Sequence, residues 1–366
     1  MTLIEEKSFF EHLQFADSER VHSEFFSWLL SPECLAISES QKINFIEKCF
    51  KLEEKIHIIK TATEIDDIDI FIETNNSILI IENKLKSFQH SNQLERYKEL
   101  VEKKYPKKAQ CFAFLTLVKE QSINNGWIHI SYYDILQELK ELSLLEHRHS
   151  FFVEDYILFL ERLLSVLNDV MAKPREFSCV FENGSLKKSN KLKLEFKSKK
   201  EEFITKNQLE TIFQKAFLIK LLDNNEIKNF QGCVGDTRGT ALIDFPLEGN
   251  ISIGDKRSYK TFIQIQGDNI KFAFAIQENY PSSNKLWIFK VIDIFKNFKN
   301  QKLNGYSKIN SPKELAYVSI SKKMDKPYWS MDLEEIVSMI TIEIKSGHEL
   351  TEKLMKEIKK MLVSNA

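Results

Sequence analysis

Two segments decide the fold of the N-terminal half of this chain: Asp67-Ile68-Asp69-Ile70-Phe71-Ile72-Glu73 and Ile78-Leu79-Ile80-Ile81-Glu82-Asn83-Lys84. The first alternates isoleucine with other residues, which predicts a strand with one buried face. The second begins as a continuous apolar run, which predicts a strand buried at the centre of a sheet. Asn75-Asn76 lies between them and favours a tight turn, because asparagine tolerates a positive φ. We therefore predict a β-hairpin.

The predicted hairpin brings three charged side chains together on one face. If Asn75 and Asn76 form a two-residue turn, Asp69 lies directly opposite Glu82, with Cβ atoms about 5 Å apart. Lys84 follows Glu82 by two residues, so strand alternation places it on the same face. The other face of the hairpin is almost entirely isoleucine.

Facing carboxylates repel each other, and a divalent cation between them removes the repulsion. Oxygen ligands in small number suit Mg²⁺, and Mn²⁺ is expected to substitute for it. A metal-bound water is a ready nucleophile, and Lys84 can offset charge that develops on a phosphate. A simpler interpretation pairs Asp67 with Lys84 as a cross-strand ion pair. The buried run before Glu82 favours a functional site, because uncompensated carboxylates are costly there.

These residues resemble the core of the PD-(D/E)xK nuclease superfamily. The resemblance rests on Ile68-Asp69-Ile70 followed by Ile80-Ile81-Glu82-Asn83-Lys84, with Ile68 where the family name has proline. Gln93 and Tyr97 resemble the QxxxY element of several branches. Glu19-Arg20-Val21-His22-Ser23 followed by Trp28-Leu29-Leu30-Ser31-Pro32 is similar to the opening helix of one bacterial branch. Together the elements cover roughly residues 10 to 130.

The resemblance implies a role for each matching residue. Asp69 and Glu82 would bind the metal and Lys84 would be the catalytic lysine. Glu19 would be an accessory acid that binds the metal directly or through water. Glu19 is equally interpreted as a first-turn glutamate that the helix dipole favours.

Gln93 and Tyr97 share one helix face, from which they could position phosphate or order the lysine. The alternative for Tyr97 is packing against the sheet together with Leu94 and Val101. His22 and Ser23 could support the site from behind, and for His22 a structural role is favoured.

The wider pattern predicts an α/β (α+β) fold, with a mixed sheet flanked by helices and then a second α+β domain. The resemblance implies that the mixed sheet is restriction-endonuclease-like. Composition changes after Pro174, so we predict a nuclease domain over 1–172, a lysine-rich linker over 173–206 and a C-terminal domain over 207–366. The C-terminal pattern predicts strands within 230–277 and helices near 207–222, 285–299, 332–346 and 349–363. Lysines in the linker, including Lys187, Lys188, Lys191 and Lys193, either are simply solvated or contact a DNA backbone.

Composition limits the surroundings and partners of this chain. It has 366 residues, a net charge of −1 and five scattered cysteines without a CxxC pair. Dispersed thiols indicate a reducing compartment, and no apolar run reaches the length of about 18 residues that a membrane span requires. We therefore expect a cytoplasmic protein without membrane contact. The near-neutral charge requires any nucleic-acid surface to be a local patch.

The resemblance implies a Mg²⁺-dependent endonuclease in prokaryotic defence against phage, restriction or repair, with DNA favoured over RNA as the nucleic-acid partner. The alternative is a binding or regulatory module that keeps the fold and cleaves nothing. Residues 207–366 are expected to pair subunits as a homodimer or to bind a partner protein.

Overall fold

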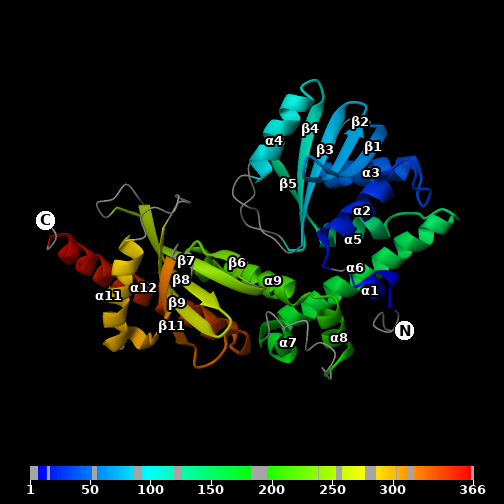
Figure 1. Ribbon diagram of the computed structural model, residues 1–366. Coiled ribbons are helices and arrows are strands. Elements are labelled where there is room, and N and C mark those ends of the chain that lie inside the picture. The colour runs from blue at the N-terminus through cyan, green and yellow to red at the C-terminus, as the bar shows by residue number, and fades with distance from the viewer. Residues whose placement is uncertain are drawn as a thin grey trace. The chain divides into compact units, whose positions relative to one another are not determined.

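A computed structural model describes the chain over residues 7–14, 17–51, 56–85, 93–118, 126–182, 196–237, 239–252, 258–276, 286–301, 303–310 and 317–363 (Figure 1). The chain forms two compact units. Unit 1 comprises Met1–Val180 and Leu186–Ala216, and unit 2 comprises Phe181–Ser185 and Phe217–Ala366.

Unit 1 is built on a five-stranded mixed sheet in the order β1-β2-β3-β4-β5. The first three strands are antiparallel, and β3, β4 and β5 run parallel. The central strand β3 is buried along its length except at its last residue, which explains its continuous apolar sequence. The strands are β1 (Ile58–Ile65), β2 (Ile68–Thr74), β3 (Ser77–Lys84), β4 (Ala109–Thr116) and β5 (Trp127–Ser131).

Helices cover both faces of this sheet. On one face α4 (Gln93–Lys104) packs Leu94, Tyr97 and Val101 against the side of β3 that carries Ile78 and Ile80. On the other face lie α2, α3 and α5, with α6 and α1 behind them (Figure 1). Their bounds are α1 (Phe9–Leu13), α2 (Glu19–Leu30), α3 (Glu39–Phe50), α5 (Tyr132–Lys140) and α6 (Arg148–Ala172). The predicted mixed sheet with flanking helices is confirmed.

The turn between β1 and β2 corrects one sequence prediction. Asp66 and Asp67 both have a positive φ, of 55° and 67°, and connect Ile65 to its partner Ile68. Such a turn matches the twist of a hairpin and accepts aspartate at both central positions. Asp67 therefore belongs to the turn and not to the strand, where the sequence pattern placed it.

Parts of the predicted linker are folded within the described residues. The segment after α6 forms η1 (Pro174–Phe177) and α7 (Ser178–Glu182). Farther on, α8 (Lys199–Lys206) buries Phe203 and Ile204 in unit 1, because its apolar side chains recur on one helix face. The four lysines from Lys187 to Lys193 that were singled out above lie outside the described residues. The domain boundaries given above stay predictions.

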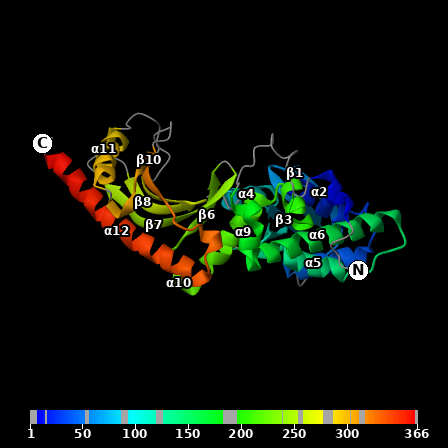
Figure 2. The same cartoon turned by 90° about the horizontal axis from the view of Figure 1, so that it is seen from below.

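Unit 2 contains a six-stranded antiparallel sheet in the order β10-β11-β9-β8-β7-β6. Both α11 (Leu286–Asn300) and α12 (Leu333–Val363) pack on it, and Figure 2 shows α12 running along one face. The strands are β6 (Cys233–Thr237), β7 (Thr240–Ser252), β8 (Ser258–Gln266), β9 (Asn269–Ile276), β10 (Lys308–Asn310) and β11 (Tyr317–Lys323). Shorter helices of unit 2 are α10 (Asn225–Lys228), η3 (Leu303–Gly305) and η4 (Tyr328–Ser330), and α9 (Glu210–Leu222) spans the division between the two units.

The prediction of two helices over 332–346 and 349–363 is wrong, since α12 is continuous. Gly347 stands at the expected break but does not end the helix. A Cβ at this position would lie 2.7 Å from Leu247 and 2.8 Å from Ile263, so glycine is needed for close packing on the sheet. Among the helices of the described residues, none is long and apolar enough to cross a membrane.

Candidate active site

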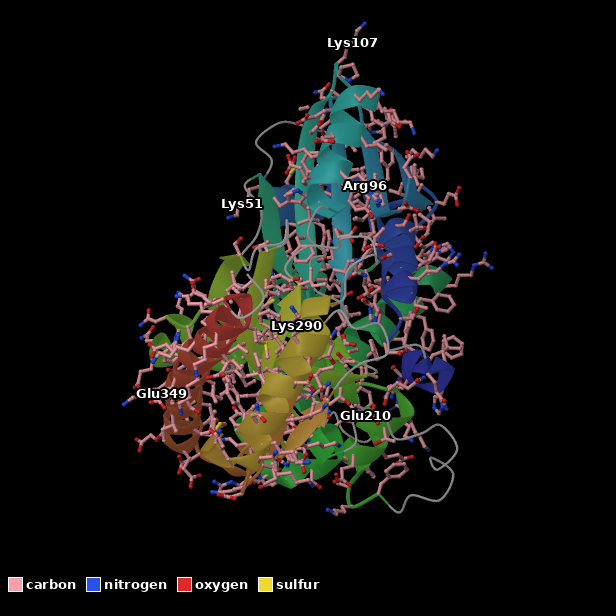
Figure 3. The ribbon with its side chains drawn as sticks, turned by 60° about the vertical axis from the view of Figure 1, so that its left-hand side comes forward. Lys51, Arg96, Lys107, Glu210, Lys290 and Glu349 are labelled. Atoms are coloured by element: carbon pink, nitrogen blue, oxygen red, sulfur yellow. The ribbon has the colours of Figure 1, made fainter. Side chains whose placement is uncertain are left out.

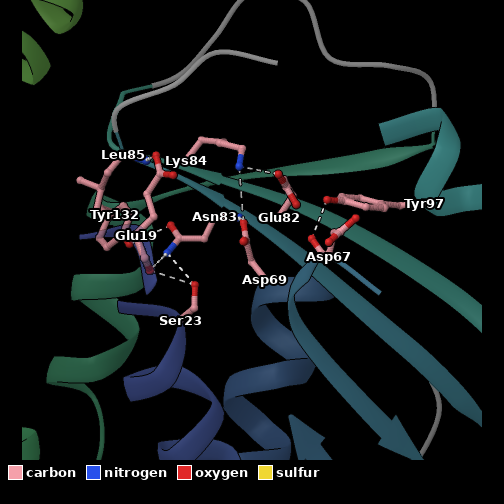
Figure 4. Close-up of polar contacts among 10 residues, drawn as sticks. All are labelled: Glu19, Ser23, Asp67, Asp69, Glu82, Asn83, Lys84, Leu85, Tyr97 and Tyr132. Atoms are coloured by element: carbon pink, nitrogen blue, oxygen red, sulfur yellow. Dashed lines mark hydrogen bonds and ion pairs between the residues drawn. The ribbon is translucent and has the colours of Figure 1, made fainter. Parts of the chain in front are cut away.

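The site lies where β2 and β3 separate, at the end of the hairpin remote from its Asn75-Asn76 turn. The structure pairs Ile70 with Ile81, which is the register that a two-residue turn predicts. Beyond this pair, a side chain makes the next hydrogen bond between the two strands. Asp69 Oδ2 accepts a hydrogen bond of 2.8 Å from the backbone N–H of Asn83, so the Asp69 carboxylate closes this end of the strand pair (Figure 4).

Lys84 lies between the two predicted carboxylates. Its Nζ is 2.6 Å from Glu82 Oε1 and 3.7 Å from Asp69 Oδ2. The side chains of Lys84, Asp69 and Glu82 are 10%, 18% and 0% exposed, so the cluster is largely shielded from water. The simpler pairing of Lys84 with Asp67 is not found. Asp67 is exposed in its turn and contacts Arg96 at 3.5 Å.

Burial sets the electrostatics of this cluster. It raises the pKa of Glu82 to about 8, and the neighbouring Asp69 carboxylate adds to the shift. Burial also raises the pKa of Asp69, although Lys84 and the Asn83 N–H oppose the change. Burial lowers the pKa of Lys84, but the charges of Glu82 and Asp69 outweigh burial. The net effect raises the pKa of Lys84 above that of an ordinary lysine. Two buried carboxylates thus share one ammonium group, and a further cation would favour the charged form of both.

Glu19 reaches the same place from α2. Its Oε1 accepts a hydrogen bond of 2.8 Å from the backbone N–H of Leu85, directly after Lys84. Its charge raises the pKa of both Asp69 and Lys84, so it belongs to the same electrostatic cluster. Glu19 is also a first-turn residue of α2, so its position agrees with both interpretations of the sequence.

Of the two QxxxY residues, Tyr97 has a described side chain and Gln93 does not. Tyr97 is buried in the core between α4 and the sheet, and its hydroxyl donates a 2.6 Å hydrogen bond to the Asp67 carbonyl. It therefore packs as the alternative predicted and also holds the β1–β2 turn. Gln93 is the first residue of α4, but its side chain lies outside the described residues.

Asn83, between Glu82 and Lys84, is the residue that sequence reasoning missed. Strand alternation turns it to the opposite face of the sheet, where it is fully buried. Its Nδ2 donates to the Glu19 carbonyl at 3.0 Å and to Ser23 Oγ at 3.1 Å, and its Oδ1 accepts from the Tyr132 hydroxyl at 2.9 Å. One amide thereby joins α2, β3 and α5 directly behind the cluster (Figure 4). A lone amide on an isoleucine face is the signal that could have revealed it.

His22 has the structural role that was favoured for it. It is buried, and its Nδ1 lies 2.7 Å from the hydroxyl of Tyr156 on α6. Ser23 supports the site indirectly, because it accepts from Asn83 and donates to the Glu19 carbonyl at 3.0 Å.

Two neighbouring tyrosines on α5 allow a matched test of this buried network. Tyr132→Phe leaves the Asn83 Oδ1 buried without its donor, and we expect a loss of about 1–3 kcal/mol in the free energy of unfolding. Tyr133→Phe removes a hydroxyl that donates to Asn168 Oδ1 at 2.7 Å near the surface. That change should stay within about 0.5 kcal/mol. Denaturant unfolding measures both, and equal losses for the two variants would contradict a special role of Asn83.

Comparison with known proteins relates the N-terminal part of this chain to one family. Residues 7–150 match the family model described as PD-(D/E)XK nuclease superfamily. This segment therefore carries a domain of that superfamily, whose members typically use divalent metals. No curated protein and no solved structure matched the chain.

A divalent metal requires several oxygen ligands around one position. Among the described residues, no group of three or more His, Cys, Asp and Glu side chains could hold a metal ion. Asp69 and Glu82 nevertheless both approach the Lys84 ammonium group, so their two carboxylates lie near each other. Mg²⁺ is commonly bound by only one or two carboxylates together with waters and phosphate oxygens. The residues present therefore fit a Mg²⁺ site with few protein ligands.

Proposed function

We propose that this chain is a metal-dependent nuclease that hydrolyses phosphodiester bonds of DNA. The observation that carries the proposal is the placement of Lys84 between the buried carboxylates of Asp69 and Glu82, inside a domain of a nuclease superfamily. Two carboxylates and one lysine leave a surplus negative charge shielded from water, which is costly unless a further cation compensates it. An endonuclease in prokaryotic defence, restriction or repair is the setting that we propose for this activity.

Asp69 and Glu82 would hold Mg²⁺, with Glu19 contributing directly or through water. Bound Mg²⁺ would supply positive charge next to the phosphate and acidify a coordinated water. Lys84 keeps its proton, because two carboxylates raise its pKa. Its ammonium group can therefore donate hydrogen bonds to a phosphate oxygen or an attacking water and stabilise the charge that develops during hydrolysis.

The surrounding residues hold these groups in place. The Asn83 N–H orients the Asp69 carboxylate, and the Leu85 N–H orients the Glu19 carboxylate. Both donors belong to the backbone at the end of β3, so the acids on β2 and α2 are aligned to one rigid strand. Such prior alignment lowers the reorganisation that the reaction requires.

A non-cleaving module that binds or regulates through nucleic acid is the second candidate. The same lysine and acids could be retained for binding alone. However, binding to a phosphate backbone requires positive groups and gains nothing from buried carboxylates. The acids therefore favour cleavage.

A substrate panel tests the proposal. Purified full-length protein is incubated with supercoiled plasmid, linear duplex, single-stranded DNA and RNA, each with Mg²⁺, Mn²⁺ or EDTA. We expect cleavage of DNA with either metal and none with EDTA, and opening of closed circular plasmid would identify an endonuclease. Retention of DNA on a gel without cleavage in any metal would instead favour the non-cleaving module.

A further inference from the structure

Unit 2 contains a basic groove between the C-terminal parts of α11 and α12. Figure 3 shows the two helices side by side, with Lys290 labelled on α11 and Glu349 on α12. The groove has a volume of about 430 Å³. It is lined by Asn297, Phe298, Gln301, Leu303, Lys353, Lys356, Glu357, Lys359 and Lys360.

The groove is strongly positive, whereas the whole chain has a net charge of −1. Four lysines and one glutamate line it, and the glutamate, Glu357, is paired with Lys360 at 2.6 Å. Lys353, Lys356 and Lys359 are exposed, and no carboxylate in the described part of the chain forms an ion pair with them. Four lysines elsewhere in unit 2 have a carboxylate within 3.0 Å, namely Lys296, Lys322, Lys323 and Lys326, whereas exposed lysines such as Lys220 and Lys345 have no ion pair with a described residue either.

The helix dipole does not account for these lysines. Lysine at a helix C-terminus is favoured by the dipole, but this effect fades beyond the last turn. Lys360 lies in the last turn of α12, whereas Lys353 and Lys356 precede it. Lys353, Lys356 and Lys360 are three and four residues apart in turn, so they share one face of α12. The dipole therefore leaves the common placement of these lysines along the groove unexplained.

The lining suits a phosphodiester backbone. At a rise of 1.5 Å per residue, Lys353 and Lys360 are separated by about 10 Å along the helix axis. This matches the axial length of about three nucleotides in one DNA strand. Asn297 and Gln301 lie four apart on the α11 side, and their amides can donate to phosphate or sugar oxygens.

We propose that this groove of unit 2 binds the phosphate backbone of duplex DNA. This inference rests on the proposed function, because it takes DNA, the proposed substrate of the nuclease domain, as the ligand of the groove. The contact is sequence-independent, since lysine and amide groups directed at phosphates carry no base readout. Unit 2 would thus add affinity for DNA without adding sequence specificity.

The test measures salt dependence with the full chain in EDTA, so that cleavage does not interfere. Binding of a labelled short duplex is followed by fluorescence anisotropy between about 50 and 200 mM salt. The groove variant carries Lys353→Gln, Lys356→Gln and Lys360→Gln. The control variant carries Lys220→Gln, Lys228→Gln and Lys345→Gln, which are exposed lysines of unit 2 outside the groove lining, so the charge change is the same.

The groove variant should flatten the slope of log K against log salt by about 0.9 per lost phosphate contact, or about 2.7 if all three lysines contribute. The control variant should keep the wild-type slope. Equal slopes for the two variants would overturn the inference, and so would wild-type protein that binds no duplex. Competition by ATP or polyglutamate as strong as by unlabelled duplex would also overturn it, because the groove would then recognise a nucleotide or an acidic peptide.

The outcomes separate this inference from the proposed nuclease activity. Metal-dependent cleavage combined with an unchanged slope in the groove variant would reject the groove and leave the nuclease standing. Groove-dependent binding by a protein that cleaves nothing would do the reverse. Thermal melts of both triple variants verify that each is folded.

Discussion

Lys84→Ala is expected to reduce Mg²⁺-dependent DNA cleavage by at least about 10²-fold, the usual effect of removing one preorganised charge stabiliser from a transition state. Lys84 is the only cation that the structure places within 4 Å of both Asp69 and Glu82 among the described residues. Its loss leaves two buried carboxylates without their ammonium partner. The measurement is the initial rate of plasmid cleavage, with circular dichroism to show that the fold is intact.

Lys108→Ala is the matched control for this variant. Lys108 lies near the opposite end of the same hairpin. Its Nζ pairs with Glu73 at 2.8 Å and donates a hydrogen bond of 2.7 Å to the Thr74 carbonyl. It is thus a half-buried lysine directly before β4 of the same sheet, and it contacts a carboxylate but not the cluster. We expect it to keep wild-type cleavage. Wild-type rates for Lys84→Ala, or equal losses for both variants, would refute the assignment of the site.

Mg²⁺ or Mn²⁺ is expected to raise the melting temperature of the wild-type protein, whether or not any substrate is cleaved. A ligand that binds only the native state stabilises it by RT ln(1 + [L]/Kd), about 2.7 kcal/mol at a hundred times Kd. Asp69→Asn removes one of the two carboxylates and should abolish most of this shift. Without metal it should melt close to wild type, because the Glu82–Lys84 pair remains and an amide oxygen can still accept from the Asn83 N–H.

Asp66→Asn is the control for the metal effect. Asp66 lies in the β1–β2 turn of the same sheet and pairs with Lys104 at 2.6 Å, outside the cluster. Its positive φ suits asparagine as well as aspartate, so the turn should persist. Thermal melts in EDTA and in Mn²⁺ compare the three proteins. A wild type that shows no metal-dependent shift would place the metal elsewhere, and so would an Asp69→Asn protein that keeps the full shift.

The hairpin shows how far a local pattern determines a site. A two-residue turn and the side-chain period of a strand sufficed to predict that Asp69, Glu82 and Lys84 converge, and the observed register agrees. This succeeded because turn length sets strand register over a few residues. The same reasoning misplaced Asp67, because a turn of two aspartates with positive φ cannot be distinguished from strand alternation by its sequence.

The support of the site was not predictable in this way. The side-chain amide of Asn83 forms hydrogen bonds with Glu19, Ser23 and Tyr132, which lie 64, 60 and 49 residues away in the chain. Its polarity on an apolar face indicates that it needs partners, since a buried amide is hydrogen-bonded. Which helices provide them depends on how α2 and α5 pack on the sheet.

The sequence by itself determined the mixed sheet, the central position of the Ile78–Ile81 strand and the meeting of three charges, because these depend on periodicity, turn length and burial of apolar residues. Only the tertiary structure decided which partner each charged side chain contacts. Glu19 could have been a simple first-turn glutamate, and packing of α2 brings it to the Leu85 N–H. Likewise, the four lysines of α12 form a groove only because α11 lies beside them. Contacts between segments distant in sequence depend on the packing of whole elements, which no local pattern encodes.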